Sequence, residues 1–168
     1  MPKIQVHKGF YNRDKVDPNA MYIFTENLDR TSGNNLITKS GNPIIDSLYL
    51  GKFYPTVTQA VVRGLPNAYP ITTKYKEQKG ALFVASQYDL FVKSIDDDIK
   101  RIIDNQSNYD IIYFSEGGFA TERSGLLYDF AITLKNKLFE SFGLYTILTK
   151  NKYFENHYGL IIENYELF

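Results

Sequence analysis

The sequence predicts a single-domain, three-layer α/β fold with a mostly parallel central sheet, and three observations support this. Short apolar runs that suit buried strands alternate along the chain with amphipathic helical patterns. The 168 residues, 43% of them hydrophobic, are enough for one domain with a real core but few for two. Glycines and capping residues mark many of the expected element ends. Strands that alternate with helices imply right-handed crossovers between parallel strands.

Composition narrows the range of functions. The 19 basic and 19 acidic side chains cancel, so no overall field favours a nucleic acid polymer or a membrane surface. There is no cysteine, and His7 and His157 are the only histidines, so we expect neither a metal site nor a cofactor. No apolar run approaches the roughly 20 residues of a membrane span. We therefore expect a cytoplasmic protein that does not bind membranes, and the sequence leaves homo-oligomerisation open.

The most informative stretch runs from a short apolar segment through two glycines into a helical pattern. Ile111–Phe114 is too short for a helix and is expected to be a central strand. Gly117 and Gly118 would let the backbone turn sharply and approach a ligand. Ser124 is the expected N-cap of a helix that ends near Phe142–Gly143. The apolar positions at helical spacing in this helix are Leu126, Leu127, Phe130, Ala131, Leu134 and Leu138.

A strand, a glycine pair and a helix N-terminus together suit a phosphate, because the helix presents unpaired N–H groups and a positive dipole end. The candidate ligand-binding residues of this loop are Gly117, Gly118, Phe119 and Thr121. The loop lacks both the dinucleotide fingerprint and the P-loop spacing. A tight turn without a ligand is therefore the alternative.

The first half of the chain contains the other expected elements. Lys3–Val6 is expected to be an edge strand and Met21–Thr25 the first core strand. The long polar segment of about residues 28–55 is expected to be a flap over a ligand, with an inserted hairpin as the alternative. Thr56 and Gln59 have capping-box spacing, so a short helix is expected over Val57–Arg63.

Further strands and one further helix are expected downstream. The expected strands are Tyr69–Thr73, Ala81–Ala85, Leu144–Leu148 and Gly159–Ile162. Ser94 and Asp97 have capping-box spacing at the start of an amphipathic helix. Asp96–Asp98 invites a metal site, but consecutive helical positions point in different directions. We expect a solvated helix start there instead.

A second group of polar residues follows the first core strand. Asn27 could bind a ribose hydroxyl or a base edge, and Arg30 and Arg63 could bind phosphate as bidentate forks. Gly33 and Gln59 complete this group of candidate ligand-binding residues. In an open α/β sheet ligands bind beyond the carboxyl ends of the strands, so this group and the Gly117–Gly118 loop should face one crevice. The alternative is that the arginines pair with Asp29 or Glu26.

Three segments of the chain carry a resemblance to known proteins. The residues are Phe24-Thr25-Glu26-Asn27-Leu28-Asp29-Arg30, Gln59-Ala60-Val61-Val62-Arg63, and Pro66-Asn67-Ala68-Tyr69-Pro70-Ile71-Thr72-Thr73. They resemble the F-x-[DE]-N-x-x-R, Q-A-x-x-R and P-N-A-x-x-I-x-T segments of a group of small, uncharacterised phage and bacterial proteins. The order of strands and loops also resembles that of macrodomains, which have a Rossmann-like architecture and bind ADP-ribose and related nucleotides. If a phage encodes the chain, the host cytoplasm is the expected location.

The resemblance implies a nucleotide partner rather than a defined reaction. Macrodomains carry several glycines after the Asn, whereas here Gly33 is alone before a long insertion. We therefore expect the protein to bind, and so sequester or sense, an ADP-ribose-like or cyclic nucleotide signal, as a phage anti-defence protein would. One alternative is a hydrolase acting on such nucleotides, with Glu116, Glu122 or Asp29 as its general base. The other is a protein-interaction module without a small ligand.

Overall fold

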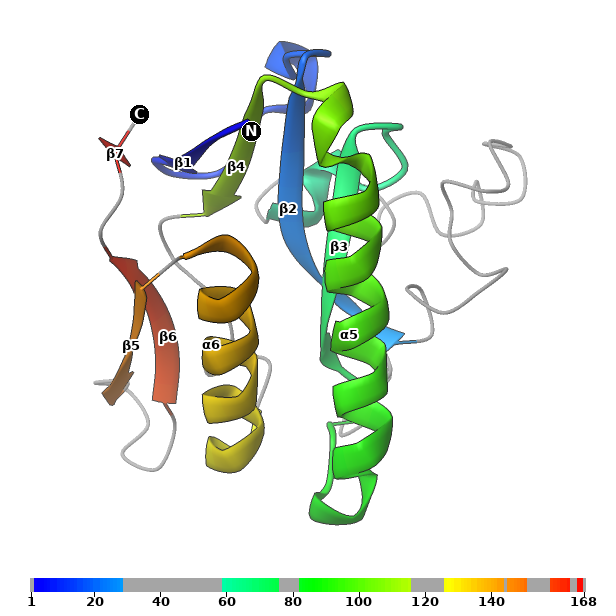
Figure 1. The fold of residues 1–168 in the computed structure, drawn as a ribbon, viewed down its shortest axis with the longest axis vertical. Helices are drawn as coiled ribbons and strands as arrows, with labels where there is room; N and C mark the ends of the chain where they lie inside the picture. Colours follow the sequence, from blue (N-terminus) through cyan, green and yellow to red (C-terminus); the bar gives the residue numbers. More distant parts are fainter. Residues whose placement is uncertain are drawn as a thin grey trace.

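The computed structural model describes residues 2–28, 59–75, 82–115, 126–143, 145–150, 158–163 and 166–167. Figure 1 shows their arrangement. Several expectations fall on the remaining residues and lie outside the described part of the chain. These are the flap after Leu28, the Thr56 cap, the Gly117–Gly118 loop and the Ser124 cap.

A parallel sheet forms the centre of the described structure. Its strands are β1 (Lys3–His7), β2 (Ala20–Asn27), β3 (Ala68–Lys74), β4 (Ile111–Ser115) and β7 (Glu166–Leu167), in the order β3-β2-β4-β1-β7. Every neighbouring pair is parallel. The prediction of an α/β fold with a mostly parallel sheet is therefore confirmed.

The predicted strand positions are largely confirmed, with two corrections. Met21–Thr25 and Tyr69–Thr73 lie inside β2 and β3, and Ile111–Phe114 is the central strand β4. The prediction of an edge strand at Lys3–Val6 is wrong, because Gln5 and Val6 of β1 also pair with β7. Met21–Thr25 is also not the first core strand, since β1 precedes it in the same sheet. The pairing of β1 with β4 and β7 joins distant segments that no local pattern reveals.

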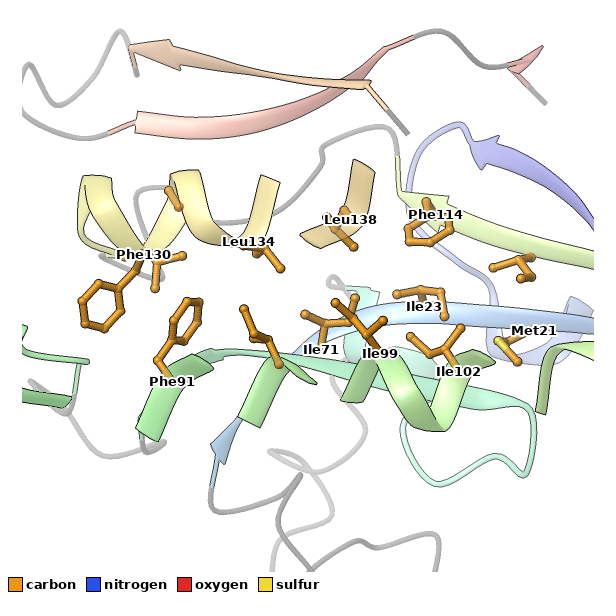
Figure 2. Close-up of a cluster of buried hydrophobic side chains, with 14 of the residues drawn as sticks. Met21, Ile23, Ile71, Phe91, Ile99, Ile102, Phe114, Phe130, Leu134 and Leu138 are labelled. Carbon is orange, nitrogen blue, oxygen red and sulfur yellow. The ribbon is translucent and has the colours of Figure 1, made fainter. Parts of the chain in front are cut away.

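Two long helices cover one face of the sheet. In Figure 1 the helix α5 (Tyr88–Asn105) lies in front of β3, and α6 (Tyr128–Phe142) lies beside α5. Figure 2 shows their apolar side chains meeting those of the strands. The fully buried residues of this core include Met21, Ile23, Ile71, Phe91, Ile95, Ile102, Ile112, Phe114, Leu134 and Leu138. Burial of each such side chain contributes about 1.5–3 kcal/mol.

The opposite face of the sheet carries a smaller core. It contains Tyr11, Ala20, Tyr22, Phe24, Val61, Val62 and Ala68. Two 3-10 helices contribute on this side, η1 (Arg13–Lys15) and η4 (Gln59–Val62). The helix expected over Val57–Arg63 is thus a 3-10 helix in its described part. Gly64, at φ 86°, ends it in the left-handed conformation that glycine adopts readily.

The start of α5 differs from the prediction. The helix begins at Tyr88, after the 3-10 helix η5 (Ala85–Gln87), and Ser94 lies inside it, where its hydroxyl donates to the carbonyl of Leu90 at 2.7 Å. The predicted cap at Ser94 is therefore wrong. The predicted strand at Ala81–Ala85 is also wrong over its described residues. This segment is apolar for another reason: Phe83 packs against Phe91 and Phe130, with ring centroids 5.2 and 6.1 Å apart.

The second helix and the C-terminal strands follow the predicted order with small shifts. In α6 the first helical residue is Tyr128 rather than Leu126, and Gly143 ends the helix at φ 66°, as predicted. The strands β5 (Tyr145–Lys150) and β6 (Tyr158–Glu163) pair antiparallel in a sheet of their own, and both contact α6. They enclose α6 from the side away from the main core (Figure 2). No helix of the described residues is long and apolar enough to cross a lipid bilayer.

Candidate functional site

Three of the nine predicted ligand-binding residues lie in the described structure. Asn27 ends β2, Gln59 begins η4, and Arg63 follows it. The other six lie outside the described residues: Arg30, Gly33, Gly117, Gly118, Phe119 and Thr121. So do the three candidate general bases, Asp29, Glu116 and Glu122.

The sheet divides at its carboxyl edge between β2 and β4. The two strands pair from Ala20–Ile111 only as far as Tyr22–Tyr113, although β2 continues to Asn27 and β4 to Ser115. Beyond this point β2 pairs only with β3, while β4 pairs only with β1. Figure 1 shows β2 and β4 diverging. The two predicted ligand loops therefore follow neighbouring parallel strands that separate before either strand ends.

The hydroxyl of Tyr11 lies at the point of division. It contacts the carbonyl oxygen of Ile23 in β2 at 2.7 Å and that of Tyr113 in β4 at 3.2 Å. Burial raises the pKa of Tyr11, and the neighbouring Tyr22 raises it further. The hydroxyl therefore stays protonated and can donate to these carbonyls. Tyr11 thus stabilises the sheet where the ladder between β2 and β4 stops.

A buried ion pair lies near the end of β2. Arg63 Nη2 donates to Glu26 Oε1 at 2.8 Å and Arg63 Nε donates to Glu26 Oε2, so the pairing is bidentate. The Arg63 and Glu26 side chains are only 8% and 2% exposed. The alternative prediction, that Arg63 pairs with an acidic residue of this strand, is therefore the arrangement found. These two nitrogens would have to leave Glu26 before they could bind a phosphate.

The ion pair is part of a network that includes the backbone of Asn27. Glu26 Oε1 also accepts from the N–H of Asn27 at 2.9 Å. On the other side, Arg13 Nη1 donates to the carbonyls of Val61 and Arg63 at 2.8 and 2.7 Å. Arg13 thus fixes the end of η4 and the position of Arg63, which follows it. Arg63 in turn binds the Glu26 carboxylate, and this carboxylate orients the peptide of Asn27.

A second buried carboxylate lies between β3 and α5. Asp98 Oδ2 accepts from the N–H and the hydroxyl of Thr72 at 2.8 and 2.7 Å, and Arg101 lies 3.4 Å from Oδ1. Burial raises the pKa of Asp98 to about 6, although the hydrogen bonds from Thr72 and the charge of Arg101 act in the opposite direction. The prediction of a solvated aspartate run is therefore wrong at Asp98, which satisfies an N–H of edge strand β3. Asp96 and Asp97 are exposed, and the described residues contain no cluster of three potential metal ligands.

A groove that the sequence reasoning missed lies at the N-terminal ends of α5 and α6. Its volume is about 610 Å³, and it is lined by Ala85, Tyr88, Leu127, Tyr128, Asp129, Phe130, Ile132 and Thr133. Tyr88, Leu127 and Tyr128 are 38%, 41% and 54% exposed. The sequence signal for this site is the run of large apolar residues at the first helical turns, outside the buried stripe of each helix.

These features define an α/β protein whose parallel sheet divides at its carboxyl edge beside a buried charged network. The sequence model of a family of unknown function (DUF7831) matches residues 6–131 of the chain. The chain belongs to that family, in line with the predicted relation to an uncharacterised group. The matched range contains all nine predicted ligand-binding residues and stops short of β5. Comparisons with curated proteins and with solved structures each gave no match.

Proposed function

We propose that this protein binds a nucleotide, of ADP-ribose-like or cyclic type, at the carboxyl edge of its sheet, and that it sequesters or senses this ligand. The division of the sheet between β2 and β4 carries the proposal. Open α/β sheets bind ligands outside the carboxyl ends of their strands, where neighbouring connections part. Asn27 ends β2 on one side of this division, and the predicted Gly117–Gly118 loop follows β4 on the other.

The network around Asn27 supports a binding role for this edge. Burial of a charged pair costs desolvation energy, and an apolar pair of similar size often gives equal or greater stability. The Glu26–Arg63 pair instead fixes the direction of the Asn27 peptide through Glu26 Oε1. The side-chain amide that this peptide carries can donate to and accept from a ribose hydroxyl or a base edge. The network thus orders the backbone at Asn27, and the fold by itself does not require this ordering.

The biological setting that we propose follows from the ligand class. In a phage, a protein that holds a nucleotide signal without releasing it would blunt a host defence that depends on that signal. This setting rests on the sequence resemblance and on the proposed ligand.

Calorimetry with ADP-ribose, its cyclic isomers and cyclic oligonucleotides tests the proposal. At least one of these ligands should bind the wild type, and Asn27→Ala should weaken its binding at least about tenfold, the loss expected for one or two hydrogen bonds in a ligand site. Asn136→Ala is the matched control, because Asn136 is exposed on α6 and lies far along the chain from this edge. If all of these ligands bind more weakly than high micromolar, the proposal fails.

Incubation followed by denaturation and chromatography separates binding from catalysis. Recovery of the unchanged nucleotide is the expected result. A converted product would instead identify a hydrolase, and substitution of Asp29, Glu116 and Glu122 in turn would then locate its general base.

A further inference from the structure

The groove at the N-terminal ends of α5 and α6 lies apart from the Glu26–Arg63 pair. Glu26 pairs with Thr72, and Thr72 bonds to Asp98, so Asp98 marks the level of the ion pair along α5. Tyr88 lies ten residues before Asp98, which at 1.5 Å per residue is about 15 Å along the helix axis. The first turn of α5 therefore extends well beyond the Glu26–Arg63 pair, and no residue that lines the groove belongs to that ion-pair network.

The ring of Tyr88 is held rigidly in this groove. The Thr133 hydroxyl donates its proton to the carbonyl of Asp129 at 2.9 Å, so Tyr88 is the donor in its 2.7 Å contact with Thr133. The same ring meets Phe130 edge-on, with centroids 5.3 Å apart. A ring fixed by a hydrogen bond and a packing contact loses little entropy on binding, so it makes a good stacking surface.

The polar groups around this ring accept hydrogen bonds. The phenolic O–H of Tyr88 donates its hydrogen bond to Thr133, so the oxygen keeps a lone pair that can accept, and Asp129 supplies an exposed carboxylate. Asp89 and Asp129 also occupy the first turns of α5 and α6, where their charges offset the positive helix ends. A phosphate would meet negative charge here, whereas a planar ring with N–H donors would find both stacking surface and acceptors.

We infer that this groove binds an amino-substituted heteroaromatic ring of the adenine type. Its volume of about 610 Å³ lies within the roughly 300–1,000 Å³ of small-molecule sites. Tyr88 provides the stacking surface, Tyr128 and Leu127 provide apolar walls, and Asp129 accepts from the exocyclic amino group. This site requires no phosphate and does not depend on Asn27.

Titration with adenosine and inosine, followed by calorimetry or saturation-transfer NMR, tests this inference. Inosine is the matched ligand, because it carries an oxygen where adenosine has the amino group. Adenosine should bind the wild type at least about fivefold more tightly than inosine, as expected for one added hydrogen bond. Asp129→Asn, a substitution at an exposed position, should reduce that preference.

Variants of the aromatic residues test the stacking surface. Tyr88→Leu should weaken adenosine binding at least about tenfold, the loss of one base–aromatic stack. Phe139→Leu is the matched control, because Phe139 is a 44% exposed aromatic residue near the opposite end of α6. Circular dichroism would verify that both variants fold.

Several results would overturn the inference. These are no saturable adenosine binding, equal affinity for adenosine and inosine, or full affinity in Tyr88→Leu. Binding of N-acetyl-arginine amide in place of adenosine would also overturn it and would point to a basic peptide. Asn27→Ala should leave adenosine binding unchanged. The experiments therefore distinguish failure of the proposed nucleotide site at β2 from failure of the proposed adenine site in the groove.

Discussion

Replacing Arg63 by methionine would remove the bidentate partner of the Glu26 carboxylate while keeping most of the side-chain volume. Glu26 is 2% exposed, so water cannot easily replace the guanidinium. Loss of one partner of such a buried pair costs about 3–5 kcal/mol. Since a domain of this size has a total free energy of unfolding of about 5–15 kcal/mol, the variant should unfold at a much lower urea concentration.

A double-mutant cycle measures this effect. The double variant Glu26→Gln with Arg63→Met should recover most of the free energy of unfolding lost by Arg63→Met, because the buried carboxylate charge is removed while the amide oxygen can still accept from the N–H of Asn27. Lys93→Met is the control: Lys93 Nζ lies 2.8 Å from Asp97 Oδ2, but the side chains are 75% and 56% exposed. Its effect should stay below about 0.5 kcal/mol. A loss of less than about 1 kcal/mol in Arg63→Met, or no recovery in the double variant, would refute the reasoning.

Two further predictions concern Asp98 and Tyr11. Because its pKa is raised from 3.8 to about 6 in the folded state, the native protein binds the Asp98 proton more tightly, and stability from this residue should fall by roughly 3 kcal/mol as pH rises from about 4 to above 6. Urea unfolding at several pH values should show this fall in the wild type and a smaller one in Asp98→Asn, and equal slopes would contradict the assignment. Tyr11→Phe should lower the free energy of unfolding by about 1–3 kcal/mol, because the buried carbonyl of Ile23 and the part-buried carbonyl of Tyr113 lose this donor. Tyr128→Phe, at a 54% exposed position, is its control, and equal effects of the two substitutions would argue against that role.

The strands were predictable because their apolar runs are local signals. Ile111–Phe114 is short, apolar and followed by glycines, and it forms β4 in the middle of the sheet. By contrast, the start of α5 was predicted wrongly, because Ser94 and Asp97 imitate a capping box inside the helix. The true start follows a 3-10 helix in which Gln87 Oε1 accepts from the N–H of Val84 at 3.0 Å.

The candidate site was only partly predictable because its contacts join distant segments. The charges of Glu26 and Arg63 suggested that they could pair, but only the fold places both on one face of the sheet. Arg13 was missed altogether, since it reaches Arg63 across 50 positions of the chain. Asp98 is buried because it meets an N–H of β3 that has no neighbouring strand, and the sequence of α5 carries no sign of this.

The position of β1 in the sheet has a consequence for the order of folding. Lys3 to His7 are made before the other strands of the sheet, yet their partner β4 starts at Ile111 and β7 pairs from Glu166. Pairings between residues so far apart close large loops, which slows folding. In contrast, β2 and β3 can pair once Lys74 has been made. During synthesis the β2–β3 unit can therefore form early, while β1 must wait until β4 has been made before it can pair.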